Sequence, residues 1–166
     1  MELHIRPKHR LEGHINVPGD KSITHRALLL GSLGDGLSRI DGFLDSGDSR
    51  ATIGCLQALG VEIDRPAQDT VVVHGRGLRG WLPPEHALDC IRSGTTMRLM
   101  AGLLAGQPFA STLTGEPQLR SRPMDRVIVP LRAMGASISG EQGDRFPPLH
   151  ITGGNLRGIH YQLPVA

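Results

Sequence analysis

The chain has 166 residues, of which 39% are hydrophobic and 20% charged, and its net charge is +2. A chain of this length can bury a core of its own, and the composition is typical of a globular protein. The near balance of charges and the small number of aromatic residues argue against nucleic-acid binding, which needs a basic face and stacking side chains. We therefore expect any bound anion to be small and held by a few cations.

The sequence contains neither an apolar segment long enough to span a bilayer nor the hydrophobic core of a signal peptide. Cys55 and Cys90 have no partner at the spacing of a metal or redox motif. We interpret them as reduced, partly buried thiols, and a single disulfide is the less favoured alternative. The sequence predicts a cytoplasmic protein with no membrane partner and no cofactor.

The first predicted elements are two short strands in residues 1–17, where apolar and polar positions alternate. The apolar positions are Leu3, Ile5, Leu11, Ile15 and Val17.

A Pro-Gly turn at residues 18–19 then leads into an apolar run, which predicts a helix over residues 22–33. Free backbone N–H groups at a helix start can hold an anion, and Lys21 and Arg26 place two cations there. Lys8 and Lys21 are the two lysines of the chain, so Lys21 is not part of a lysine-rich surface. A phosphate or carboxylate site and a simply capped helix are both compatible with this turn.

The first half continues with a predicted strand over residues 38–44 and a cluster of helix-cap residues at 45–49. The helix predicted over residues 48–59 ends at Gly60, and short strands follow at 61–63 and 70–74. Its inward stripe consists of Thr52, Cys55, Leu56 and Leu59.

The second half repeats this pattern. Ser93 and Gly94 open a helix whose apolar run covers residues 99–104, and a strand at 109–113 and a turn at 115–117 follow. A helix from about Pro123 should be kinked at Pro130 and ended by Gly135, and the closing strands are predicted at 136–139 and 149–152. The inward positions of this helix are Met124, Val127, Ile128 and Leu131.

Two pairs of arginines measure the repeat: Arg26 and Arg98 are 72 positions apart, and so are Arg50 and Arg122. We therefore predict an α/β (α+β) protein made of tandem units, the first at residues 18–92 and the second at 93–166. Such units need neighbours to bury their faces. A third unit is due near position 169, so we interpret the chain as a piece of a longer protein whose third unit is truncated.

Cations gather near the two predicted helix starts, where they would converge if the units pack side by side. They are Lys21, Arg26, Arg50, Arg92, Arg98, Arg120 and Arg122. Arginine offers a planar fork for carboxylate or phosphate oxygens, although a solvated surface role is the alternative for each one. Asp45 and Asp48 could act as acid and base, but helix capping is favoured. The histidines, including His25, show no metal-ligand spacing, so no metal site is predicted.

Several motifs together resemble the 5-enolpyruvylshikimate-3-phosphate synthase family. The motifs are PGDKSITHRA (residues 18–27), LDSGDSRAT (44–52), SGTTMR (93–98), LTGEP (113–117) and RPM (122–124). The resemblance runs from about residue 3 to the last residue and covers about two-fifths of the usual family length. A sister family, the UDP-N-acetylglucosamine enolpyruvyl transferases, lacks the Asp-Lys-Ser found at residues 20–22.

The resemblance implies two domains of three β-α-β-α-β-β units each, with the substrates between the domains and the strand segment of residues 1–17 in the other domain. It implies transfer of the enolpyruvyl group of phosphoenolpyruvate to the 5-hydroxyl of shikimate 3-phosphate. By motif, Lys21, Ser22 and Arg26 would bind shikimate 3-phosphate. Lys21, Gly94 and Arg122 would bind phosphoenolpyruvate.

This sequence departs from the family pattern in two ways. Ile91-Arg92 stands where the family usually has Gly-Asn, so we expect that the backbone there cannot adopt a positive φ and that the phosphoenolpyruvate pocket is altered. The acid/base carboxylate of the family, its Ser-Gln turn and further Lys and Arg clamps have no match in this chain, so its catalytic residues are unknown. The alternatives to an enzyme fragment are a non-catalytic anion-binding remnant and one half of a split enzyme completed by a C-terminal fragment.

Overall fold

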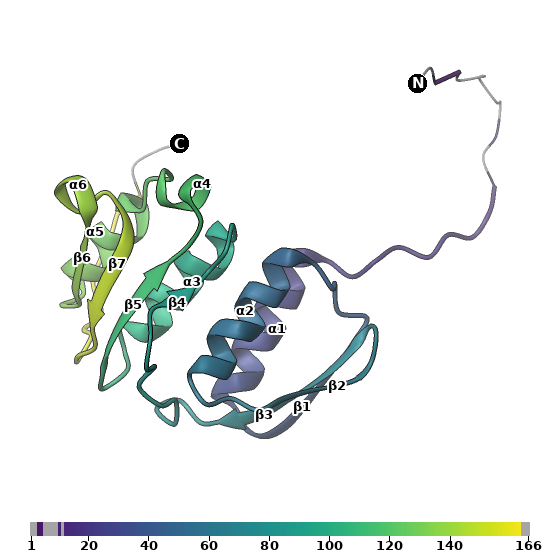
Figure 1. Cartoon of the computed structure of the whole chain (residues 1–166), viewed down its shortest axis with the longest axis horizontal. Coiled ribbons are helices and arrows are strands. Elements are labelled where there is room, and N and C mark those ends of the chain that lie inside the picture. The colour runs from purple at the N-terminus through teal and green to yellow at the C-terminus, as the bar shows by residue number, and fades with distance from the viewer. Residues whose placement is uncertain (1–2, 5–9, 11, 164–166) are drawn as a thin grey trace.

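The structure, a computed structural model, describes residues 3–4, 10 and 12–163. The first half of the chain forms a three-stranded sheet and two helices (Figure 1). In chain order they are α1 (Lys21–Leu33), β1 (Asp35–Asp41), α2 (Gly47–Ala58), β2 (Ile63–Ala67) and β3 (Thr70–Arg76). The last strand, β3, lies in the middle and pairs antiparallel with both others.

The second half forms a four-stranded sheet and its helices. These elements are β4 (Leu88–Asp89), α3 (Gly94–Leu104), β5 (Ala110–Thr114), α4 (Pro117–Arg120), α5 (Asp125–Ala133), β6 (Ser137–Gly140), α6 (Glu141–Asp144) and β7 (Phe146–Thr152). The strand β7 pairs antiparallel with β5 and β6, while β4 joins the edge of the sheet parallel to β5.

Both sheets place the strand that comes last between the two that precede it, in the orders β1-β3-β2 and β5-β7-β6. The mixed α/β class and the repeated helix–strand–helix–strand–strand pattern are therefore confirmed. The two helix-ending glycines are also confirmed, because Gly60 (φ +80°) and Gly135 (φ +99°) adopt the left-handed conformation that glycine tolerates best.

Polar side chains fix the starts of the three long helices. The Asp20 carboxylate accepts from the backbone N–H of Ile23 at 2.7 Å at the start of α1. At the start of α2, Ser46 and Ser49 exchange bonds in a capping box. The hydroxyl of Ser93 accepts from the N–H of Thr96 at the start of α3. Caps of this kind typically contribute about 1 kcal/mol each to stability.

One apolar cluster runs through both halves of the described chain and joins the inner faces of the two sheets to the helices. The predicted inward stripe of α2 is confirmed, because Thr52, Cys55, Leu56 and Leu59 are all buried. Full burial of a leucine side chain is worth about 1.5–3 kcal/mol, so this stripe anchors α2 between the two units. Ile128 and Leu131 of α5 are buried beside the half-buried Val127, and so is Met124 directly before the helix.

Some predicted boundaries are wrong by a few residues. The strand expected at 38–44 is β1 (Asp35–Asp41), because Gly42 adopts φ +69° and turns the chain. The strand expected at 61–63 begins at Ile63 instead, since the Val61 N–H donates to the Leu56 carbonyl at the end of α2. The turn predicted at 115–117 continues into the short helix α4. The helix expected from about Pro123 is α5, which begins at Asp125 and contains Pro130.

The strands predicted in residues 1–17 are absent from the part of this segment that is described. Residues 3–4, 10 and 12–17 belong to no strand, and Ile5 and Leu11 lie outside the described residues. Residues 12–17 extend away from the sheets, where no described strand can pair with them (Figure 1).

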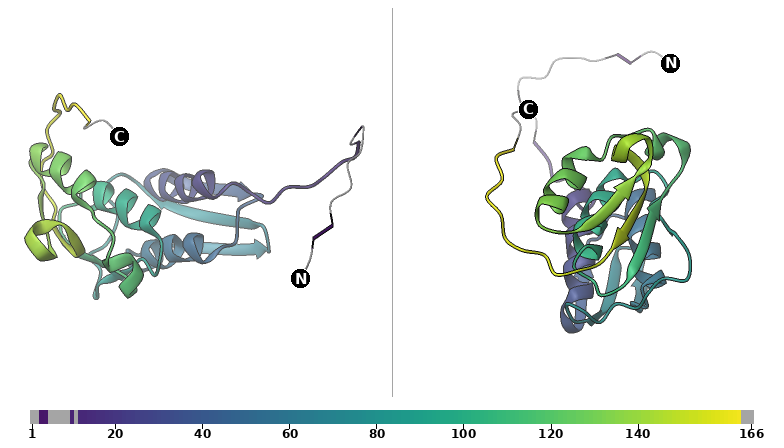
Figure 2. Two further views of the ribbon diagram at one scale, coloured as in Figure 1. Left: turned by 90° about the horizontal axis from the view of Figure 1, so that it is seen from above. Right: turned by 90° about the vertical axis from the view of Figure 1, so that its left-hand side faces the viewer.

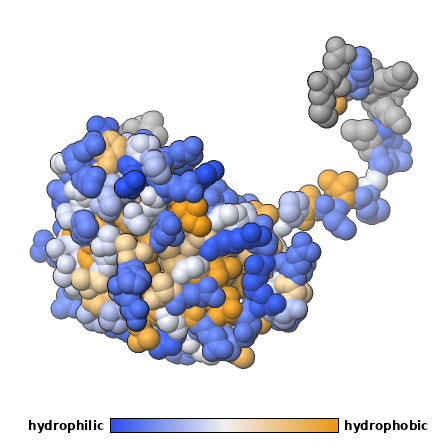
Figure 3. Space-filling model, viewed as in Figure 1, coloured by the Kyte–Doolittle hydropathy of each residue, from blue (hydrophilic) through white to orange (hydrophobic). Residues whose placement is uncertain are grey.

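Seen from above, α1, α2 and α3 run in roughly the same direction (Figure 2). Hydrophobic residues remain visible near the middle of the face shown in Figure 3, around α2 and α3. Within the described part of the chain, none of the helices combines the length and hydrophobicity that crossing a membrane requires.

Candidate functional site

The start of α1 brings together three of the predicted residues. The Arg26 guanidinium reaches back along the helix and donates to the Ser22 carbonyl oxygen at 3.0 Å. On the other side of the helix start, Lys21 Nζ lies 2.8 Å from Asp48 Oδ2 in the first turn of α2. All three residues are exposed, so the cations of Lys21 and Arg26 face solvent.

The two acidic residues near α2 have roles other than the predicted capping. The cap of α2 is Ser46, whereas Asp48 is ion-paired with Lys21. Asp45 accepts from the Arg50 guanidinium at 2.7 Å and from Arg65 at 2.8 Å, and these two cations hold the pKa of its carboxyl well below the usual range. Capping was the wrong prediction because a cluster of Ser, Asp and Gly does not reveal which member faces a distant cation.

The start of α3 carries a group of arginines. A Cβ atom at Gly94 would lie 2.7 Å from Arg98 Nη1 and 3.4 Å from Arg122 Nη1, so both guanidinium groups press against this glycine. Burial lowers the pKa of Arg98, and the nearby charges of Arg122 and Arg126 lower it further. Among the described residues, no carboxylate is ion-paired with Arg98 or Arg122, which leaves positive charge available for an anion.

A buried chain of hydrogen bonds connects the two helix starts. His25 Nδ1 lies 2.7 Å from Thr52 Oγ1, which lies 2.8 Å from Thr96 Oγ1, and the Thr96 hydroxyl donates to Ser93 Oγ at 2.8 Å. The Thr96 hydroxyl also lies 3.3 Å from the Asp48 carbonyl oxygen, next to the Lys21 ion pair. Burial lowers the pKa of His25 and favours its neutral form. These hydrogen bonds could not be predicted from the sequence, because they join residues of α1 and α2 to the start of α3.

The Ile91-Arg92 segment corrects one expectation. Ile91 adopts φ +53° although it is β-branched, so a positive φ occurs here at an energetic cost and not only with glycine. The bonds around it hold the turn: its N–H donates to Asp89 Oδ1 at 2.8 Å, and its carbonyl accepts from the Glu116 N–H. The Arg92 side chain is ion-paired with Glu116.

The predicted set of cations therefore divides into two groups. Lys21, Arg50 and Arg92 are ion-paired with carboxylates, whereas Arg98 and Arg122 lie together at Gly94. The hollow at the first turn does not bring these cations together. It has a volume of about 540 Å³, and its lining includes the acids Asp45 and Asp69 and no lysine or arginine.

The two cysteines are separate in the sequence but adjacent in the fold. Both are buried and free, as predicted for reduced thiols. A hydrogen bond with Cys55 and burial raise the pKa of the Cys90 thiol far above its usual range, so Cys90 offers no nucleophilic thiolate.

These features define a class of protein: a mixed α/β fold of tandem units with lysine and arginine side chains at its helix starts. The model of the EPSP synthase (3-phosphoshikimate 1-carboxyvinyltransferase) family matches residues 5–166, and the chain belongs to this family.

Relatives and a solved structure agree with this assignment. The 3-phosphoshikimate 1-carboxyvinyltransferase of Chloroflexus aurantiacus is 54% identical over 158 residues, which are 95% of this chain and 36% of that protein. The Alkalilimnicola ehrlichii enzyme of the same name is 54% identical over 167 residues, which span 100% of this chain and 37% of that protein. The EPSP synthase structure from Acinetobacter baumannii matches with a TM-score of 0.89 and 43% identity over 93% of this chain and 35% of the other. The chain thus spans a little over a third of the length of the curated relatives it matches.

Proposed function

We propose that this chain supplies the helix-start half of the active site of a 3-phosphoshikimate 1-carboxyvinyltransferase. The reaction transfers the enolpyruvyl group of phosphoenolpyruvate to the 5-hydroxyl of shikimate 3-phosphate and releases phosphate. The tetrahedral intermediate keeps both a carboxylate and a phosphate, so preorganised cations stabilise it without a cofactor. Small anions are therefore the proposed partners, and nucleic acid and membranes are not.

Each substrate is assigned to one helix start. Lys21, Ser22 and Arg26 at α1 bind shikimate 3-phosphate, while Lys21, Gly94 and Arg122 bind phosphoenolpyruvate at α3. The observation that carries the proposal is the pair of guanidinium groups of Arg98 and Arg122 against Gly94, where a Cβ would leave only 2.7 Å to the nearest nitrogen. Glycine at this position lets an anion approach the backbone closely, and guanidinium groups bind carboxylate and phosphate oxygens well.

Calorimetric titration of the chain with shikimate 3-phosphate tests the first assignment. We expect binding that is lost in Lys21→Ala and kept in Arg79→Ala, an exposed arginine in the turn after β3. A folded sample that binds no shikimate 3-phosphate would refute the formed site at α1. The matching titration with phosphoenolpyruvate should lose binding in Arg122→Ala and keep it in Arg79→Ala, and equal affinities in both variants would refute the assignment at α3.

We also propose that the chain consists of two units, residues 18–92 and 93–166, and that a complementary C-terminal fragment binds to it. An apolar groove of about 300 Å³ lies between α1 and α3 and is lined by Leu29, Leu30, Leu99, Gly102, Leu103 and the stem of Arg26. Leu30 is 68% exposed there, which is costly for a leucine in the middle of a helix. Nearly two thirds of each of these relatives lies outside the matched stretch, and we propose that this part covers the groove.

A mixing experiment tests the groove. The part of the Alkalilimnicola ehrlichii relative outside the matched stretch is added to this chain, and phosphate release from the two substrates is measured. Leu30→Glu should abolish the activity, whereas Leu37→Glu, on the exposed face of β1 and 70% exposed, should leave it unchanged. Equal activity of both variants would refute docking at this groove.

The mixing experiment also separates the alternatives. Activity of the mixture supports one half of a split enzyme, and binding of substrate without activity supports a non-catalytic anion-binding remnant. We also propose a cytoplasmic location, because the two free, adjacent thiols are typical of proteins kept in a reducing compartment.

A further inference from the structure

We propose a divalent metal site on the outer face of the first sheet, formed by Glu62, Asp64 and His74. Ligand atoms of these three side chains lie within 4.8 Å of one another. His74 Nε2 is 2.8 Å from Asp64 Oδ2, and its Nδ1 is 3.9 Å from Glu62 Oε2. This group could not be recognised in the sequence, because Glu62 and Asp64 are distant from His74 in the chain and the three share no motif spacing.

The strand register explains why the three side chains meet. The strands β2 and β3 pair antiparallel with Ile63 opposite Val73, and the His74 N–H donates to the Glu62 carbonyl at 3.0 Å. Glu62 is therefore opposite His74, and Asp64 is two residues further along the same strand. Residues two apart on a strand share a face, so both carboxylates and the imidazole project from one side of a paired and rigid segment.

The charge of the group is not balanced by a neighbouring base. In the described part of the chain, no lysine or arginine is ion-paired with Glu62 or Asp64. Arg76 comes from the same strand as His74, but it donates to the carbonyl oxygens of Gly60 and Gly80, at 2.9 and 2.7 Å. Two carboxylates that share an imidazole attract a cation, which can be the imidazolium itself or a metal ion.

The ligand set selects the kind of metal. One imidazole and two carboxylates suit Zn²⁺ and similar transition ions, whereas Mg²⁺ and Ca²⁺ prefer oxygen ligands alone. A zinc ion sits about 2.0–2.2 Å from each ligand, so its ligands lie at most about 4 Å apart. The side chains of Glu62 and Asp64 are 72% and 57% exposed, and they are free to make the small rotations that this closer spacing requires.

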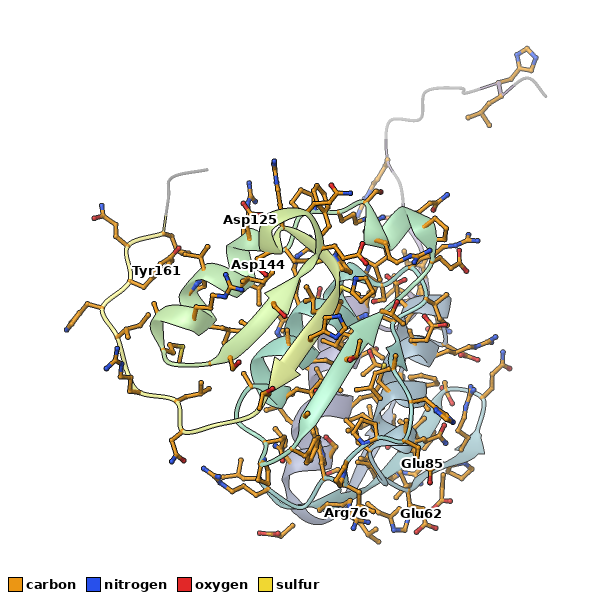
Figure 4. All side chains as sticks on the ribbon, turned by 60° about the vertical axis from the view of Figure 1, so that its left-hand side comes forward. Glu62, Arg76, Glu85, Asp125, Asp144 and Tyr161 are labelled. Atoms are coloured by element: carbon orange, nitrogen blue, oxygen red, sulfur yellow. The ribbon has the colours of Figure 1, made fainter. Side chains whose placement is uncertain are left out.

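The site is separate from the proposed substrate site. Figure 4 shows Glu62 well away from Asp125, which follows Arg122 by three positions in the chain. The proposed transfer reaction uses none of these three residues, so metal binding and substrate binding can fail independently. Zinc here would tie β2 to β3 and stabilise the folded chain by mass action.

Titration of the metal-free chain with ZnCl₂, followed by calorimetry and thermal unfolding, tests the proposal. We expect one zinc ion per chain, a higher melting temperature with zinc, and no effect of MgCl₂. His74→Ala and Asp64→Asn should weaken binding at least tenfold and remove the rise in melting temperature. His86→Ala, which removes an exposed histidine outside the group, should bind as the unaltered chain does.

All three altered positions are on the surface, and circular dichroism before titration verifies that each variant is folded. Equal zinc affinity in His74→Ala and His86→Ala would overturn the proposal, as would a folded chain that binds no zinc. In the latter case the group is a histidine paired with two carboxylates, without a metal.

Discussion

The left-handed conformation of Ile91 allows a direct measurement of backbone strain. At φ +53° an L-residue pays roughly 1–2 kcal/mol that glycine does not pay. Glycine in turn loses about 0.5–1 kcal/mol relative to alanine through greater freedom in the unfolded chain. Ile91→Ala and Ile91→Gly remove the same partly exposed side chain, so side-chain packing cancels between them. We expect Ile91→Gly to be more stable than Ile91→Ala by about 0.5–1 kcal/mol.

A matched pair in a helix provides the control. Leu30 is 68% exposed in the interior of α1, where glycine is about 1 kcal/mol less favourable than alanine. The order of stability of the Gly and Ala variants should therefore reverse between the two positions. Urea unfolding of the four variants gives the two differences, and each should also appear as a shift of about 2–4 °C in melting temperature per kcal/mol. The reasoning about strain is refuted if alanine is the more stable residue at both positions.

Three further predictions concern the buried chain and the second helix start. Thr52→Val should lower the free energy of unfolding by about 1–3 kcal/mol in chemical denaturation, because it removes the hydrogen-bond partner of the buried His25 Nδ1 and one of the partners of the Thr96 hydroxyl; an unchanged value would contradict it. The pKa of His25 is lowered from 6.5 by burial, so the unfolded chain binds this proton first and stability should decline as the pH falls from 6.5 toward the folded-state pKa. Denaturation at several pH values should show a flatter slope in this window for His25→Gln, and identical slopes would exclude His25 as the cause. Gly94→Ala should weaken phosphoenolpyruvate binding in calorimetry by displacing guanidinium groups, whereas Gly102→Ala, with open space around its Cβ position, should not.

Local signals predicted the helices of this protein well. Asp20, Ser46 and Ser93 are short polar residues directly before apolar runs, and each one caps the helix that follows. The glycines that end α2 and precede β6 were equally clear, because a positive φ strongly favours glycine. Strand limits were less predictable: the end of β1 depends on Gly42, whose turn is set by tertiary contacts.

The candidate site was predictable in composition but not in pairing. Lys21, Gly94 and Arg122 could be named from motifs, yet nothing in the local sequence shows that Asp48 pairs with Lys21 or that Glu116 pairs with Arg92. These contacts join residues 24 or more positions apart, and periodicity carries no information over that distance. The positive φ of Ile91 was missed for a different reason: the surrounding hydrogen bonds impose a backbone conformation that its own side chain disfavours.

The hydrogen-bonded chain from His25 to Ser93 determines how α3 can lie against α2. Apolar contact is non-directional and tolerates sliding, but hydrogen bonds have strict distance and angle requirements. A shift of α3 by one helical turn, about 5.4 Å, would separate the Thr52 and Thr96 hydroxyls, which now lie 2.8 Å apart, and so break the hydrogen bond that joins α2 to α3. The two halves of a repeated fold could otherwise dock in several registers. The hydrogen bond between Thr52 and Thr96 therefore favours one register of α3 against α2, and so sets the spacing between the cations at the start of α1 and those at the start of α3.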